Sequence, residues 1–142
     1  MFEISLISLD TVLAFSSKML AFLVGLAALI FVHELGHFLA ARRYGVIVEK
    51  FSIGFGKKLF GTTSNGTEFI IAAIPLGGYV KMKGEGLDEE TNEEGSFSAA
   101  PPQHRLLIAF AGPFFNILFA LAIYIFVYMA GVETLSPVIG TV

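Results

Sequence analysis

A run of 27 residues without Asp, Glu, Lys, Arg or His, from Leu106 to Val132, constrains this chain more than any other feature. As a helix rising about 1.5 Å per residue, the run would be about 40 Å long, against a bilayer hydrocarbon core of about 30 Å. Core helices of soluble proteins seldom extend this far without a charge. The segment 104–132 is therefore predicted to be a transmembrane helix.

The composition agrees with a membrane protein and excludes several other classes. Hydrophobic residues make up 55% of the 142 residues and charged residues 15%, and the mean hydropathy is +0.76, which excludes a disordered chain. Without cysteine there is neither a disulfide framework nor a thiolate metal site. A net charge of -3 argues against nucleic acid as a partner.

A second apolar segment, 19–41, is also long enough to span a bilayer and contains His33, Glu34 and His37 as its ionisable residues. It lacks the basic n-region and the small-residue cleavage site of a signal peptide. We therefore predict a retained transmembrane helix. Residues 1–18 form an N-terminal segment for which two alternatives stay open, a helical extension or an interfacial segment.

The basic residues predict the orientation of these two helices. Eight of the nine lie between them: Arg42, Arg43, Lys50, Lys57, Lys58, Lys81, Lys83 and Arg105. Because positively charged loops stay in the cytoplasm, loop 42–105 is expected to be cytoplasmic and both ends of the chain extracytoplasmic. The lipid bilayer is therefore an expected partner.

The loop between the helices carries strand-like segments over 42–84. Residues 46–53, 57–60, 67–74 and 79–83 are expected to be short strands, with a tight Asn65-Gly66 hairpin turn and a further turn at residues 75–78. Residues 69–74 do not alternate, so both their faces should be covered by protein or lipid. An acidic linker follows over 85–103. The predicted fold is an α-helical integral membrane protein with two transmembrane helices and a small, largely antiparallel, membrane-associated β-sheet.

The sequence His33-Glu34-Leu35-Gly36-His37 carries the candidate chemistry. Two histidines four residues apart lie on one face of a helix, so their imidazoles can share one metal ion, typically zinc. Glu34 projects beside them and can take a proton from a water that the metal activates. Ionisable groups in a membrane helix cost roughly 2.5–3.5 kcal/mol each near its centre, which favours a functional role for all three. Gly36 should let another helix or a substrate approach closely.

With these motifs the chain resembles the site-2 proteases, which are intramembrane zinc metalloproteases. The resemblance covers about 19–142 and rests on HELGHFLAARRYGV, FSIGFGKKLF, IPLGGYVKM and AGPFFN, in this order. It implies one Zn²⁺ held by His33 and His37, with Glu34 as the general base. It also implies substrate-binding residues: Gly54, Phe55, Gly56, Ile71, Gly77, Gly78 and Asn116. From the residue alone, a single amide in a spanning helix favours a hydrogen bond between helices over a catalytic group, and with the resemblance the two interpretations stay equally open.

The resemblance also implies parts that this sequence does not contain. The third zinc ligand of the family is an Asp in a later transmembrane helix, and His104, Glu85 and Asp88 do not match that motif. In one bacterial subgroup, extracytoplasmic PDZ domains lie between the second helix and that Asp. Residues 133–142 resemble the lead-in to such a domain, so we expect the chain to be an N-terminal portion of the protease.

The expected function is cleavage of a peptide bond within the transmembrane segment of single-span membrane proteins. The resemblance implies trimmed anti-sigma factors or remnant signal peptides as substrates. An unwound substrate must pair its main chain in lipid, and residues 69–78 are the strand-like segment available for that pairing. Two alternatives stay open: a membrane metalloenzyme that is not a peptidase, and a non-catalytic membrane module with a relic motif.

Overall fold

The structure, a computed structural model, describes residues 9–86 and 93–131. Its elements follow in the order α1 (Leu9–Arg43), β1 (Val48–Ser64), β2 (Thr67–Met82) and α2 (Pro102–Ala130). Residues 1–8, 87–92 and 132–142 lie outside the described residues. These include all of the predicted lead-in 133–142.

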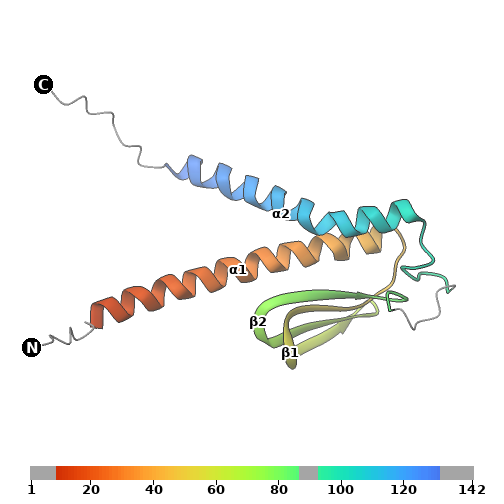
Figure 1. The fold of residues 1–142 in the computed structure, drawn as a ribbon, viewed down its shortest axis with the longest axis horizontal. Helices are drawn as coiled ribbons and strands as arrows, with labels where there is room; N and C mark the ends of the chain where they lie inside the picture. The colour runs from red at the N-terminus through yellow and green to blue at the C-terminus, as the bar shows by residue number, and fades with distance from the viewer. Residues whose placement is uncertain (1–8, 87–92, 132–142) are drawn as a thin grey trace, which may run out of the picture.

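The two helices are long, apolar and largely uncovered. They lie side by side near Arg43 and Pro102 and diverge towards the other ends, with the sheet beside the C-terminal half of α1 (Figure 1). Helix α1 begins at Leu9, so residues 9–18 extend the predicted helix. By length and composition, both helices could cross a membrane. Two long apolar helices with a small antiparallel sheet fit a membrane protein, as expected from the sequence.

The hairpin turn between β1 and β2 falls where the sequence predicts it. Strand β1 ends at Ser64 and β2 begins at Thr67. Between them Asn65 and Gly66 have positive φ angles of 48° and 80°. Positive φ at both central residues is the geometry that Asn-Gly favours and that suits the twist of a hairpin. The predicted tight turn is therefore confirmed.

The sheet consists of two long, bent strands in place of four short ones. The first part of β1 has partners on both sides: Phe51 pairs with Val80 and with Phe69. The last part of β1 pairs with the first part of β2, as Thr62 does with Phe69. Four strand segments thus lie in the order 60–64, 67–71, 48–53 and 78–82 across the sheet.

The bends replace the turn predicted at residues 75–78, which is wrong because these residues continue β2. Strand β1 bends at Gly54 and Gly56, whose φ angles of 93° and 83° are accessible mainly to glycine. A Cβ at Gly54 would also meet the carbonyl oxygen of Ile74. The two strands therefore curve together without leaving the sheet.

A small core connects the sheet to both helices. It consists of Ala41, Val46, Val48, Phe51, Val80, Met82 and Ile108. Because this cluster includes α1, both strands and α2, it fixes the 78–82 side of the sheet against the helix pair. That side of the sheet is where the candidate site lies.

Candidate functional site

His33 and His37 face each other one turn apart on α1. Their Nε2 atoms are 3.2 Å apart and their rings meet edge to face, with centroids separated by 4.9 Å. Zinc–nitrogen bonds of about 2.0–2.1 Å at the tetrahedral angle place two nitrogens about 3.3 Å apart. The observed separation therefore suits two ligands of one tetrahedral ion.

Helix α2 fixes the ring of His37. The Nδ1 atom lies 2.8 Å from the carbonyl oxygen of Ile108. A carbonyl only accepts, so Nδ1 carries the proton and donates it to Ile108, which leaves Nε2 without a proton and able to bind a metal. The hydrogen bond thus selects the tautomer that metal binding needs.

Asn116 of α2 makes the corresponding hydrogen bond to the ring of His33. The Nδ2 atom of its side-chain amide lies 3.2 Å from Nδ1 of His33. The buried Oδ1 atom of the same amide has no hydrogen-bond partner in the described part of the chain. Turning the amide by 180° exchanges the two atoms. Oδ1 would then accept from Nδ1–H and leave Nε2 available for a metal. The geometry places Asn116 to orient a ligand, which the substrate contact implied by the resemblance did not anticipate.

Two glycines let the helices approach closely enough for these contacts. A Cβ on Gly36 would meet the backbone of Ala111 and the ring of Phe115. The close approach expected at Gly36 is therefore confirmed, with α2 as the neighbour. A Cβ on Gly112 would overlap the imidazole of His37. Sequence reasoning missed Gly112 and Ile108, since a backbone carbonyl and a missing side chain leave no chemical signature.

The edge of β2 lies beside these residues. A cavity of about 360 Å³ is lined by Glu34, His37, Gly78, Tyr79, Val80, Met82, Glu85, Phe97, Ile108 and Ala109. A Cβ on Gly78 would come within 3.0 Å of Glu34 Cγ. Pro113 has no N–H to donate to Ala109, four residues earlier. The cavity thus brings together Glu34 and His37, the edge of β2 and a helix carbonyl that lacks its usual N–H donor.

The predicted substrate-binding residues of the two glycine segments gather at the bend of the sheet. The ring of Phe55 packs over Gly77 and stacks on Tyr79, with ring centroids 6.3 Å apart and planes within 8°. Gly54 and Gly56 form the bend on either side of Phe55. The contact of these residues with substrate stays a prediction. Among the predicted glycines, Gly78 is the one that lies against the side chain of Glu34.

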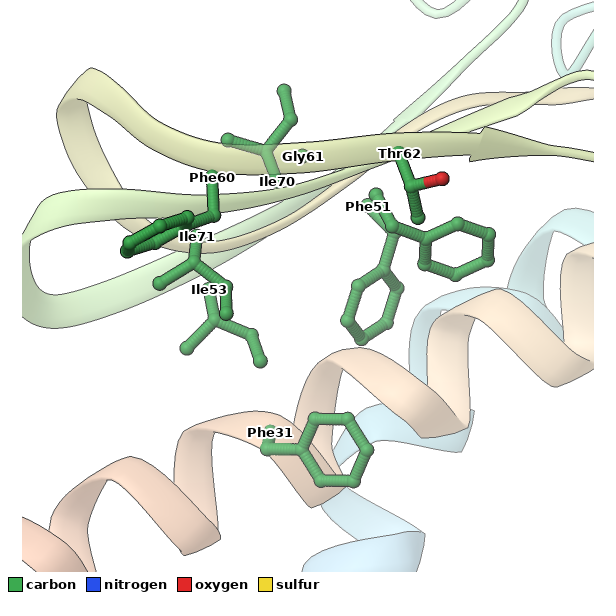
Figure 2. A pocket seen from close by; sticks show the side chains of 9 residues that line it. Phe31, Phe51, Ile53, Phe60, Gly61, Thr62, Ile70 and Ile71 are labelled. Carbon is green, nitrogen blue, oxygen red and sulfur yellow. The ribbon is translucent and has the colours of Figure 1, made fainter.

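Ile71 lies in a different environment. It pairs with Ile53 on one side and Phe60 on the other, so residues around it are not an edge at which a substrate strand could pair. The expectation that the whole of 69–78 offers an edge is wrong for this reason. The side chain of Ile71 instead lines an apolar pocket of about 460 Å³ between the sheet and Phe31 of α1 (Figure 2). A substrate contact there stays a prediction.

The described residues do not complete a metal site. Among residues 9–86 and 93–131, no group of three His, Cys, Asp or Glu could hold an ion. His104 stacks on Tyr44, with ring centroids 4.5 Å apart, and Glu85 accepts a hydrogen bond from the main chain of Met82. Asp88 lies outside the described residues. The two histidines fit a zinc ion as part of its ligand shell.

The position of Asn116 leads to a prediction that separates its two roles. If the amide orients His33, Asn116→Ala lowers zinc affinity about 10- to 100-fold, as loss of an outer partner of a ligand typically does. Asn116→Asp keeps an acceptor for Nδ1–H and should retain zinc. Metal titration of the purified full-length protein measures both. A raised KM with unchanged zinc affinity in Asn116→Ala would instead identify a substrate contact.

Comparison with known proteins gives matches over most of the chain. Residues 21–141 match the model of peptidase family M50. The chain is 50% identical over 125 residues to the protease RseP of Yersinia pestis and 46% identical over 133 residues to the regulator of sigma-E protease RseP of Escherichia coli. These matches cover 86% and 92% of this chain but 28% and 30% of the relatives.

A Helicobacter pylori protein with a provisional zinc metalloprotease name is 53% identical over 122 residues, which are 81% of this chain and 34% of that protein. The chain therefore spans about a third of the length of the curated relatives that it matches.

Proposed function

The chain belongs to peptidase family M50, the site-2 proteases, and from this premise we propose that its protein is an intramembrane zinc endopeptidase acting on single-span membrane proteins. One observation carries the proposal: the Nε2 atoms of His33 and His37 lie 3.2 Å apart, and His37 lines a cavity together with Glu34 and the edge of β2. A metal site, a proton acceptor and an extended binding surface together are what peptide hydrolysis needs.

Each residue has a role in the proposed reaction. His33 and His37 hold one zinc ion, and an Asp from a later transmembrane helix completes the ligands, as the resemblance implies. When bound, zinc would lower the pKa of a bound water to about 7 and would polarise a carbonyl. Glu34 accepts the proton of the attacking water and returns it to the leaving amine.

The substrate binds in this proposal as a strand on β2. Residues 78–82 pair with β1 on one side, and the described part of the chain supplies no strand on the other. A transmembrane helix that unwinds in lipid exposes main-chain groups at a cost of several kcal/mol each. Pairing with the edge at Gly78 and Val80 satisfies them beside Glu34.

The bend of the sheet is proposed to enter the bilayer. Gly78 lies against Ile30 as well as Glu34, so this end of the sheet is beside the apolar part of α1. Its apolar side chains are exposed: Phe55, Leu59, Phe60, Ile71, Ile74 and Leu76. Such an apolar surface favours contact with lipid. Lipid would then cover the exposed side chains of residues 69–74, as the sequence led us to expect.

Removal of the metal tests the proposed activity. Full-length protein in detergent should cut a single-span peptide, lose the cleavage after chelation and regain it with zinc. A variant with His33→Ala should not regain it, because one imidazole alone holds the ion too weakly. Mass spectrometry of the peptide measures cleavage. Activity that survives full removal of the metal would contradict the proposal.

The proposed location is the bacterial inner membrane, crossed several times, with loop 42–105 cytoplasmic. Arg42 and Arg43 end α1, and Arg42 donates to the carbonyl of Asn65, so the hairpin tip lies level with this basic end. Ser64→Cys, in a sequence without cysteine, should react with an impermeant thiol reagent only in inverted vesicles. Reaction in intact cells, compared with a labelled periplasmic control protein, would reverse the orientation.

The substrates are proposed to be trimmed anti-sigma factors or remnant signal peptides. The resemblance to site-2 proteases suggests both, and the name of the Escherichia coli relative, which refers to the regulation of sigma-E, supports the first. Both kinds of substrate cross the membrane once and would present one helix to the site.

A further inference from the structure

The main chain of β2 ends at a contact that the proposed reaction does not use. The N–H of Met82 donates to Oε2 of Glu85 at 3.2 Å. Along a strand, N–H and C=O groups point the same way at every second residue, so those of Val80 and Gly78 point to the side that Glu85 occupies. Glu85 also lines the cavity with Glu34 and His37. Its carboxylate stands where the carbonyl oxygen of an added strand would lie.

The loop that carries Glu85 is held in place. Lys83 donates its N–H to Ile47 and accepts from Phe97, at 2.9 and 2.8 Å. The carbonyl of Gly84 accepts from Ser98 Oγ at 2.7 Å. Gly84 is buried and has a φ of 68°, so the turn between Met82 and Glu85 requires glycine. The position of Glu85 is therefore set by both strand β2 and residues 95–98.

We propose that Glu85 determines the register of the substrate by closing the β2 edge at Met82. An extended substrate can then pair at Gly78 and Val80 but cannot continue to Met82. Without the carboxylate, the substrate can slide along the edge. Because side chains alternate, a slide must move it by two residues to keep the same faces towards the cavity. Glu85 would thus be a positioning residue that selects which peptide bond lies beside Glu34. This role rests on the proposed peptidase function.

Cleavage position is the readout that tests this role. Full-length zinc-loaded protein in detergent is given one synthetic single-span peptide of about 25 residues, and the products are sized by mass spectrometry. Wild type should cut at one bond. Glu85→Ala should raise the share of product displaced by two residues about three- to tenfold relative to the main product, the weight of one main-chain hydrogen bond. Glu85→Gln retains an acceptor oxygen and should cut like wild type.

A matched control removes the same charge nearby. Glu94 is exposed and lies in the same acidic linker, so Glu94→Ala should leave the cleavage position unchanged. A displaced product in both alanine variants would assign the effect to charge and overturn the role of the Met82 contact. One unchanged product in Glu85→Ala would overturn it as well.

Amide hydrogen exchange separates this inference from the proposed function. In Glu85→Ala the amide of Met82 should exchange faster than in wild type, and the added peptide should slow it again. In wild type the peptide should leave this amide unchanged. Equal exchange in the two proteins overturns the inference whether or not the peptide is cut. Wild type that cuts no peptide, with the exchange of Met82 as described, overturns the peptidase proposal and leaves Glu85 only as a limit on where a peptide pairs with β2.

Discussion

Glu34→Gln should retain zinc and lose peptide cleavage by a factor on the order of 10² or more. Glu34 lines the cavity together with His37 and the β2 edge, where a water and a substrate carbonyl would have to meet. The amide keeps the size of the side chain but cannot accept a proton from water. Because the metal ligands are untouched, the zinc content of the purified protein should stay at the wild-type level.

Two measurements on the same preparation check this result: metal content and the rate of cleavage of a single-span peptide. Asp10→Asn is a matched control, since it makes the same change on the same helix, in the first turn of α1. Cleavage at the wild-type rate by Glu34→Gln would refute the general-base role. Wild-type protein that binds zinc but cuts no peptide would favour a membrane metalloenzyme that is not a peptidase. Wild-type protein that binds no zinc would favour a non-catalytic module with a relic motif.

Gly112→Val should abolish stable zinc binding, with a loss of affinity of 10-fold or more. A Cβ at this position would lie within 3.0 Å of three atoms of the His37 ring. The ring cannot turn away without breaking its hydrogen bond to the carbonyl of Ile108. The clash therefore either displaces Nε2 from the shared metal position or pushes α2 away from α1. Metal titration of the full-length protein measures the loss.

The control for this substitution is Gly25→Val on α1. Apart from its chain neighbours and the backbone of its own helix, no atom lies within 4 Å of a Cβ at Gly25, so the same change adds the same bulk to a helix without touching the site. Gly112→Ala tests the steric explanation with a smaller group and should give an intermediate affinity. Gly112→Val protein that elutes like wild type from a sizing column yet binds zinc normally would show that the helices do not pack this closely.

Local patterns predict much of this fold because the signals are themselves local. The apolar runs of α1 and α2, and the Asn65-Gly66 turn, each reflect an interaction between residues near in sequence. The order of the four strand segments does not. Phe51 pairs with residues 18 and 29 positions further along the chain, and no periodicity in either segment encodes this choice. Residues 75–78 look like a turn because of Pro75 and the two glycines, but the pairing of Gly78 with Ile53 keeps them in the strand.

The candidate site divides in the same way. His33, Glu34 and His37 are recognisable from spacing, since one helix turn brings two imidazoles together. Their partners on α2 are not. Ile108 contributes a backbone oxygen and Gly112 an absence of side chain, and both matter only because α2 crosses α1 at this point. In the sequence, Glu85 resembles the other acidic residues of a solvated linker. Its contact with Met82 depends on the hydrogen bonds of Lys83 and Gly84 that hold the loop.

The hydrogen bonds that hold the two imidazoles also set an order of assembly during synthesis. His37 and Ile108 are 71 residues apart in the chain, and His33 and Asn116 are 83 apart. At about 5–20 residues per second, the ribosome makes the first of these partners roughly 4–14 s after the histidine. As a membrane helix, α1 would therefore enter the bilayer before the hydrogen-bond partners of its histidines have been synthesised. Until α2 has been made, neither imidazole has the hydrogen-bond partner that selects its tautomer. A metal ion that reached α1 at this stage would meet two rings whose orientation is not yet fixed.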